Sequence, residues 1–207
     1  MQEEGVIKLN CTWVKEAPLD FVLIKELNEW RNKLYNAGLI GMNKDGLGYG
    51  NISIRFQQNK FIITGSSTGR FEKLTTAHYT QVTDYNFDEN KLTTIGPVTA
   101  SSESLTHAMI YECQKNINAV MHVYHLKLWK KLLNTLPATN KNIEYGTTGM
   151  AREIVRLFKE TNLLVHKIFS MAGHEEGIVS FGKDLNEAGQ IILDQLKNIN
   201  ITKRSYF

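Results

Sequence analysis

Two histidines three positions apart, His122 and His125, follow an apolar run in the stretch NAVMHVYHLK. An imidazole at the end of a buried strand must find a polar partner, so His122 could bind a metal ion, relay a proton or make a structural hydrogen bond. A further histidine, His174, stands in a turn and is followed by Glu175 and Glu176. Catalytic zinc commonly has three protein ligands and an open position. The spacing of these histidines therefore leaves their role open.

Three short loops are rich in glycine, hydroxyl and amide groups: GYGN (48–51), GSSTG (65–69) and TASSES (99–104). The third opens an expected helix, whose free N–H groups and dipole favour a phosphate. Each loop taken alone is an ordinary turn or helix cap. Three such loops in one small chain favour an anion-binding site.

Glu103 falls in the first turn of the helix that TASSES opens, where an acidic residue is stabilising in any case. A phosphate beside it would favour its protonated form by like-charge repulsion and suit it to proton transfer near neutral pH. His107 lies one helical turn later on the same face. We expect His107 to be a partly exposed helix residue.

Hydrophobic periodicity gives the elements that must position these residues. Helices are expected over 18–39, 99–115, 126–136, 146–162 and 184–200, and strands over 46–56, 60–69, 118–124, 164–173 and 177–182, with a hairpin over 79–96. Asp20 is the expected cap of the first helix and Gly38 its stop. Helices interleaved with adjacent strands predict one α/β domain with a mixed sheet over residues 1–207.

Composition excludes several classes of protein. The chain has 207 residues, 42% of them hydrophobic and 22% charged, with a net charge of +3. Lys and Arg are scattered, so no nucleic-acid partner is expected, and no apolar run is long enough to span a membrane. Cys11 and Cys113 match no metal or redox spacing and are expected to be reduced thiols. The start, MQEEGVIKLN, lacks the apolar core of an export signal, so we expect a cytoplasmic protein.

The segments GYGNISIRF, FIITGSSTG, SSESLTHAMIY, NAVMHVYH and SMAGHEEGIVSFGKDLNEAG, in this order, resemble the class II aldolase/adducin family. The resemblance covers roughly residues 20 to 197. It implies a three-layer α/β/α sandwich around a mixed, largely antiparallel sheet. It also implies a homo-oligomer, usually a tetramer, with active sites between subunits.

The resemblance also implies roles for particular residues. Glu103 matches the acid/base, and His122 and His174 match two of three zinc ligands. The phosphate-binding positions match Asn51, Thr68, Gly69, Ser101 and Ser102. The loop TGSSTG is longer than the family's usual Thr-Pro-Ser/Thr-Gly.

The third zinc ligand of the family falls on Tyr124. On a regular strand, residues 122 and 124 face one way and His125 faces the other, so His125 replaces the ligand only if a bulge or the strand's end re-aims it. Tyr124 could bind as a phenolate, at the cost of removing a proton with a pKa near 10. The remaining alternative is a two-histidine site that holds metal weakly or not at all.

The function implied is that of a metal-dependent aldolase, which cleaves or forms a C–C bond in a small sugar phosphate through a metal-stabilised enediolate. Sugar-phosphate epimerases and dehydratases share the fold and the metal chemistry. The alternative is a catalytically degenerate, adducin-like domain that binds a partner or an anionic metabolite, for which Tyr124 is the main evidence.

Overall fold

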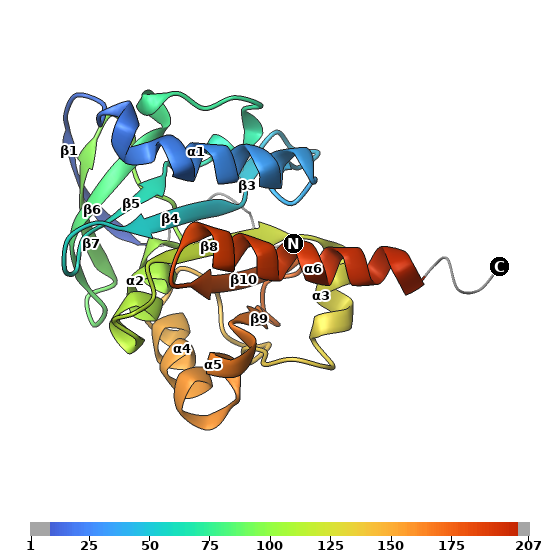
Figure 1. The fold of residues 1–207 in the computed structure, drawn as a ribbon. Coiled ribbons are helices and arrows are strands. Elements are labelled where there is room, and N and C mark those ends of the chain that lie inside the picture. The colour runs from blue at the N-terminus through green and yellow to red at the C-terminus, as the bar shows by residue number, and fades with distance from the viewer. Residues whose placement is uncertain (1–8, 203–207) are drawn as a thin grey trace.

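The chain is built around an eight-stranded sheet, which the computed structural model describes together with its helices for residues 9–202. The strand order is β1-β7-β6-β5-β4-β8-β10-β9, and every neighbouring pair is antiparallel except β1 with β7 (Figure 1). The strands are β1 (Asn10–Lys15), β4 (Asn51–Arg55), β5 (Phe61–Thr64), β6 (Tyr79–Asn86), β7 (Lys91–Gly96), β8 (Ala119–Tyr124), β9 (Ile168–Ser170) and β10 (Gly177–Gly182). The first eight residues, which carry most of the segment predicted to lack an export signal, lie outside the described part.

Helices cover both faces of this sheet. They are α1 (Phe21–Asn36), α2 (Ser104–Cys113), α3 (Leu126–Leu132), α4 (Thr148–Glu160), α5 (Leu163–His166) and α6 (Leu185–Thr202), with the 3-10 turns η1 (Thr68–Arg70) and η2 (Thr76–His78) and a small ribbon of β2 (Gly41–Met42) and β3 (Gly48–Tyr49). The predicted three-layer α/β/α fold with a largely antiparallel sheet is confirmed.

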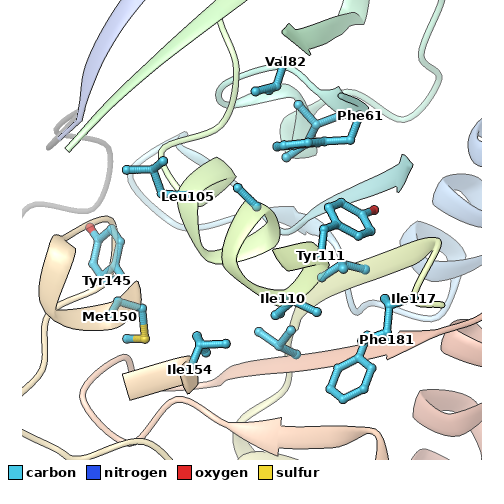
Figure 2. Packing of buried hydrophobic residues seen from close by; sticks show 14 of the residues in the cluster. Phe61, Val82, Leu105, Ile110, Tyr111, Ile117, Tyr145, Met150, Ile154 and Phe181 are labelled. Carbon is cyan, nitrogen blue, oxygen red and sulfur yellow. The ribbon is translucent and has the colours of Figure 1, made fainter. Parts of the chain in front are cut away.

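Alternation along the strands divides the interior into two cores, one on each face of the sheet. Ala119, Met121 and Val123 of β8 pack with residues of α1, α3 and α6, whereas Val120 packs with residues of α2 and α4. Figure 2 shows the second core, in which Tyr111 of α2 lies near the sheet. His122 and Tyr124 share the parity of Val120, so β8 directs them to the α2 side.

Helix α1 follows the sequence signals that predicted it. The Asp20 side chain accepts a hydrogen bond from Val22 N at 2.9 Å, which caps the first turn. Gly38, at φ +71°, adopts the left-handed conformation just past the helix, where glycine carries no Cβ penalty. Both predicted boundary signals are confirmed.

Two segments differ from the sequence prediction. The predicted strand over 164–173 divides into the short helix α5 and the strand β9, because Lys167 takes a left-handed turn between them. Strand β1 was not predicted. It is the edge strand paired in parallel with β7, and nearly all its side chains are exposed, so it lacks the hydrophobic alternation that reveals a strand. No helix within residues 9–202 combines the length and the apolar character needed to cross a membrane.

Candidate active site

All three small-residue loops meet at one cleft with a volume of about 100 Å³. Its walls come from residues 47–51, 65–67 and 101–103, together with Tyr124, Tyr145 and His174. The cleft therefore combines groups suited to binding an anion with a cluster of aromatic and imidazole rings.

His122 is positioned by the register of the sheet. Strand β8 pairs it with Asn51 of β4 on one side and with Val179 of β10 on the other. The ring is fully buried, and its Nδ1 lies 3.4 Å from Asn51 Nδ2. Within residues 9–202, neither His122 Nε2 nor Asn51 Oδ1 has a hydrogen-bond partner. Reversing the Asn51 amide would present Oδ1 to His122 Nδ1–H, which is how a metal-binding imidazole is usually oriented.

Burial also sets the charge of His122. It lowers the pKa of this imidazole well below its ordinary value, and the nearby His174 and His107 lower the pKa further. His122 is therefore neutral near pH 7, which is the protonation state that binds a metal.

His174 lies in the turn between β9 and β10 and is brought close to His122. The two ring centroids are 5.5 Å apart, and the Tyr124 ring lies 4.9 Å from His122 and 5.1 Å from His174. The Tyr124 hydroxyl forms a hydrogen bond with His174 Nε2. On its other side, His174 packs on Tyr145 at 4.2 Å between centroids. The two predicted zinc ligands thus converge from remote segments, with Tyr124 between them.

Gly177 makes this convergence possible. A Cβ at this position would lie 2.7 Å from His174 Cδ2 and 3.1 Å from His122 Nε2. Distances this short would force one of the imidazoles to move, so a side chain at residue 177 and the observed ring positions are incompatible.

His125 is used elsewhere. Its Nδ1 accepts a hydrogen bond from Leu128 N at 3.0 Å, so the side chain caps α3. The strand's alternation is not broken by a bulge at this end, and the structure brings Tyr124, not His125, to the two predicted ligands.

Glu103 enters the cleft from the start of α2. Its side chain is 3% exposed, and Oε2 accepts a hydrogen bond from Thr106 Oγ1 at 2.9 Å. Ser101 and Ser102 precede it and also line the cleft, and Ser101 Oγ accepts from Glu103 N at 3.3 Å. The predicted acid/base and two of the predicted phosphate-binding residues are therefore neighbours on one wall.

The loop 65–69 lies at the cleft, but with a different register from the one predicted. Ser66 and Ser67 line the cleft, whereas Thr68 and Gly69 are buried beneath it. The Thr68 hydroxyl donates to Gly65 O at 2.8 Å. Thr68 and Gly69, which the family resemblance matched to phosphate-binding positions, are therefore not among the residues that line the cleft.

His107 differs from its prediction as well. It is fully buried, not partly exposed, and its Nδ1 lies 2.7 Å from Ser53 Oγ, which is also 2.7 Å from the Tyr111 hydroxyl. Burial lowers the pKa of His107 to about 3. Sequence analysis also missed Tyr49 and Tyr145 as cleft residues. Tyr49 lies within the GYGN loop, whereas Tyr145 follows no motif that could have identified it.

The donors at this end of the cleft are two imidazoles and a phenol. Within the described part of the chain, no group of three or more His, Cys, Asp and Glu side chains is placed to hold a metal ion. The neutral His122, its unpartnered Nε2 and the adjacent His174 nevertheless fit a divalent cation, with the Tyr124 oxygen as third donor.

The chain belongs to the family described as Class II Aldolase and Adducin N-terminal domain, which it matches over residues 32–193. No functionally curated protein matches it closely enough to be called a relative.

Solved structures share its fold at low sequence identity. A sugar-phosphate aldolase from Thermotoga maritima has a TM-score of 0.66 at 17% identity, covering 87% of this chain and 93% of that one. L-fuculose-1-phosphate aldolase from Thermus thermophilus has a TM-score of 0.62 at 19% identity, covering 89% and 95%. YgbL from Escherichia coli, a candidate aldolase/epimerase/decarboxylase, has a TM-score of 0.62 at 16% identity, covering 84% of each chain.

Proposed function

We propose that this protein is a metal-dependent lyase that cleaves or forms a C–C bond in a small sugar phosphate. The observation that carries the proposal is the meeting of Glu103 and His174 at one cleft, with the buried His122 ring 5.5 Å from that of His174 and with three glycine- and hydroxyl-rich loops as the other walls. The packing of the fold does not require two imidazoles from remote segments and a buried carboxyl group to lie close together, so their proximity points to a function. Two of the solved structures with this fold are named as aldolases of sugar phosphates, which supports the same class of substrate.

His122 and His174 would hold the metal, with Tyr124 as the third ligand. When bound there, a divalent cation supplies a Lewis acid that stabilises negative charge developing on substrate oxygens. Asn51 would orient the His122 ring from behind.

Glu103 would move the proton. In the cleavage direction its carboxylate takes the proton of the substrate hydroxyl whose carbon becomes the new carbonyl, and it returns a proton to the carbon released. The Thr106 hydroxyl holds Oε2, which fixes the carboxyl group for this transfer.

The loops would bind the phosphate group. Ser66, Ser67, Ser101 and Ser102 offer hydroxyl groups at the cleft wall, and the start of α2 adds backbone N–H groups. Anchoring the phosphate places the reacting carbon against Glu103, so binding energy is converted into orientation.

A binding domain without catalysis is the second candidate. The Tyr124 hydroxyl occupies His174 Nε2, the nitrogen that a metal would need, and this contact favours a site that has lost its metal. Such a domain would keep the anion loops and bind an anionic metabolite or a partner.

Activity assays separate these candidates. Purified protein supplemented with zinc is incubated with a panel of ketose phosphates, and products are identified by chromatography and mass spectrometry. Release of an aldehyde supports the lyase, whereas an isomeric or dehydrated product identifies an epimerase or a dehydratase on the same site. If no product forms in a metal-dependent way, the lyase is refuted and the binding domain without catalysis is supported.

We also propose a homo-oligomer, by analogy with the family. Light scattering on the eluting protein tests this, and a monomeric mass would contradict it.

A further inference from the structure

Arg31 of α1 is a buried cation that holds the segment just after the cleft loop 65–67. It is 1% exposed, yet it donates only to backbone carbonyl groups. Nη1 donates to Glu72 O at 2.7 Å, and Nη2 donates to the carbonyls of Thr68 at 3.3 Å and Gly69 at 3.1 Å and to that of Phe71. One side chain thus fixes four carbonyl groups in five residues.

No ion pair with a carboxylate in the described part of the chain balances this charge. Burial lowers the pKa of Arg31 and is the largest influence on it. Two tyrosines, Tyr79 and then Tyr35, raise the pKa by smaller amounts. The guanidinium stays protonated at neutral pH all the same. Within residues 9–202 no ion pair involves Arg31, and its Nε has no hydrogen-bond partner. The four carbonyl groups and the Tyr35 ring, whose centroid lies 4.6 Å from Arg31 Cζ, offset part of the cost of burying this charge, and an anion within reach of its field would offset more.

The segment that Arg31 holds is in tight backbone contact with the other wall of the cleft. A Cβ at Gly69 would lie 2.2 Å from Tyr49 O, and a Cβ at Gly48 would lie 2.4 Å from Ser67 O. Ser67 Oγ also accepts from Gly48 N at 3.1 Å. Displacing residues 68–69 would therefore displace Gly48 and Tyr49, which line the cleft.

The peptide groups are oriented by the same contacts. The carbonyl and N–H of a trans peptide point in opposite directions. Since the carbonyls of Thr68 and Gly69 turn toward Arg31, the N–H groups of Gly69 and Arg70 turn away from it. Arg70 N lies 2.6 Å from the place that a Cβ at Gly48 would take, so this nitrogen adjoins the loop 48–49. Aligned peptide dipoles of this kind favour a negative charge on their N–H side.

We propose that Arg31 is a positioning residue for the anion end of the cleft: it orients the loop 65–70 and supplies an unbalanced positive charge behind it, so that an anionic group such as a phosphate binds in front. The inference rests on the proposed function for the identity of that group. It assigns a substrate-affinity role to a residue that lies outside the cleft.

Arg55 provides a matched control within the same chain. It too donates to four backbone carbonyls, those of residues 58, 111, 114 and 117, and lies over a tyrosine ring. Its charge acts on the carboxyl group of Glu112, whose pKa it helps to lower, and the residues it holds do not follow directly on a loop that lines the cleft, as those held by Arg31 do. Arg31 and Arg55 therefore share a scaffold role and differ in charge balance and position.

The test is calorimetric titration of the full chain, as purified, with inorganic phosphate. Arg31→Lys keeps the charge and loses most of the fork of hydrogen bonds, whereas Arg31→Gln keeps a donor and loses the charge. We expect Arg31→Gln to weaken phosphate binding about tenfold, Arg31→Lys to stay within about threefold of wild type and Arg55→Gln within about twofold. In the assay with a ketose phosphate, Arg31→Gln is expected to raise KM and leave kcat nearly unchanged.

Each other outcome has a defined meaning. Equal phosphate affinity of wild type and Arg31→Gln overturns the inference, as does an Arg31→Lys variant as weak as Arg31→Gln. Wild-type protein that binds no phosphate overturns the inference and the proposed anion site together. The expected pattern of affinities without any cleavage of ketose phosphates would sustain the inference and refute the proposed lyase.

A wild-type measurement covers the case in which Arg31→Gln fails to fold. Phosphate is titrated into ¹⁵N-labelled protein while the arginine Nε–H resonances are followed by NMR, with the Arg31 signal assigned from its loss in Arg31→Lys. The Arg31 resonance is expected to shift and the Arg55 resonance to stay in place. An unmoved Arg31 resonance on saturation with phosphate overturns the inference.

Discussion

The two ends of the cleft are built in different ways. At the end proposed to bind a metal, which we call the metal end, His122 and Tyr124 stand two residues apart on β8, and His174 precedes β10, the strand paired with β8. At the end proposed to bind an anion, which we call the anion end, three loops meet through backbone contacts at glycines and through the carbonyl groups that Arg31 holds. One end is positioned by strand register and the other by contacts between remote loops.

This difference should separate the two proposed functions of the site. A change at the metal end should alter metal affinity and leave phosphate affinity in place, and a change at the anion end should do the reverse. Glu103 lines the same cleft and belongs to the loop 99–104 at the start of α2.

Glu103→Gln should have the largest effect, because it removes the proposed proton-transfer group, which both ends would serve. The amide keeps the shape of the side chain and a contact with Thr106, so we expect cleavage to fall by about 10² to 10⁴ with little change in metal or phosphate affinity. Steady-state kinetics with a ketose phosphate measures this. Glu112→Gln, on the same helix but outside the cleft, is the control and should retain activity. An active Glu103→Gln enzyme would remove Glu103 from the mechanism.

Two glycine substitutions separate the ends directly. Gly177→Ala places a methyl group against both imidazoles and should weaken zinc binding by about tenfold or more, whereas Gly48→Ala places one against Ser67 O and Arg70 N and should weaken phosphate binding similarly. Both affinities are measured for both variants. Loss of both affinities in either variant would show that the ends are coupled.

Gly149→Ala is the matched control for these glycines. Its Cβ would meet no atom closer than 3.4 Å, at Thr147 Oγ1, which is ordinary contact. Neither affinity should change, and thermal unfolding should confirm that all three variants fold.

Acid should destabilise the interior behind the metal end. The pKa of His107 is about 3 in the folded protein, against about 6.5 when unfolded. Between these values the unfolded chain binds the extra proton, so the stabilising contribution is complete above about pH 6.5 and is lost at up to about 1.4 kcal/mol per pH unit as the pH falls toward 3. Urea unfolding across this range measures the slope. His107→Gln should make the slope shallower, and an unchanged slope would contradict the burial of a neutral His107.

Tyr124→His should have the smallest effect, confined to the metal end. A neutral imidazole replaces a phenol that must lose a proton to bind metal, so we expect zinc affinity to rise about tenfold and its dependence on pH to weaken. Competition with a chelator measures the affinity. His125→Ala, which removes the cap of α3, should leave zinc affinity within about twofold. Equal gains in both variants would rule out Tyr124 as the third ligand position.

The sequence predicted the orientation of His122, Tyr124 and His125 better than it predicted which residues of the loop 65–69 face the cleft. Alternation along NAVMHVY places His122 and Tyr124 on one face of β8 and His125 on the other, and the structure has this arrangement. The three loops were also found from composition, and they do meet at one cleft. Local signals of this kind predicted most helices and strands.

The remaining features depend on contacts between distant segments. The packing of Gly69 against Tyr49 determines which residues of GSSTG face the cleft. Local composition does not predict that contact. The burial of His107 depends on Ser53 from another strand, and the position of β1 depends on pairing with β7. From the sequence, Arg31 is one polar residue on an amphipathic helix, and nothing in the sequence predicts that it is buried or which carbonyl groups it binds.

Metal content of the purified chain tests the proposed centre most directly. Elemental analysis by mass spectrometry, before and after reconstitution with zinc, should find about one divalent cation per wild-type chain and far less in His122→Ala. Phosphate affinity should be the same in both proteins, which shows that the variant is folded. Wild-type protein that takes up no metal after reconstitution, or a His122→Ala variant that keeps the full amount, would contradict a metal centre at His122 and His174.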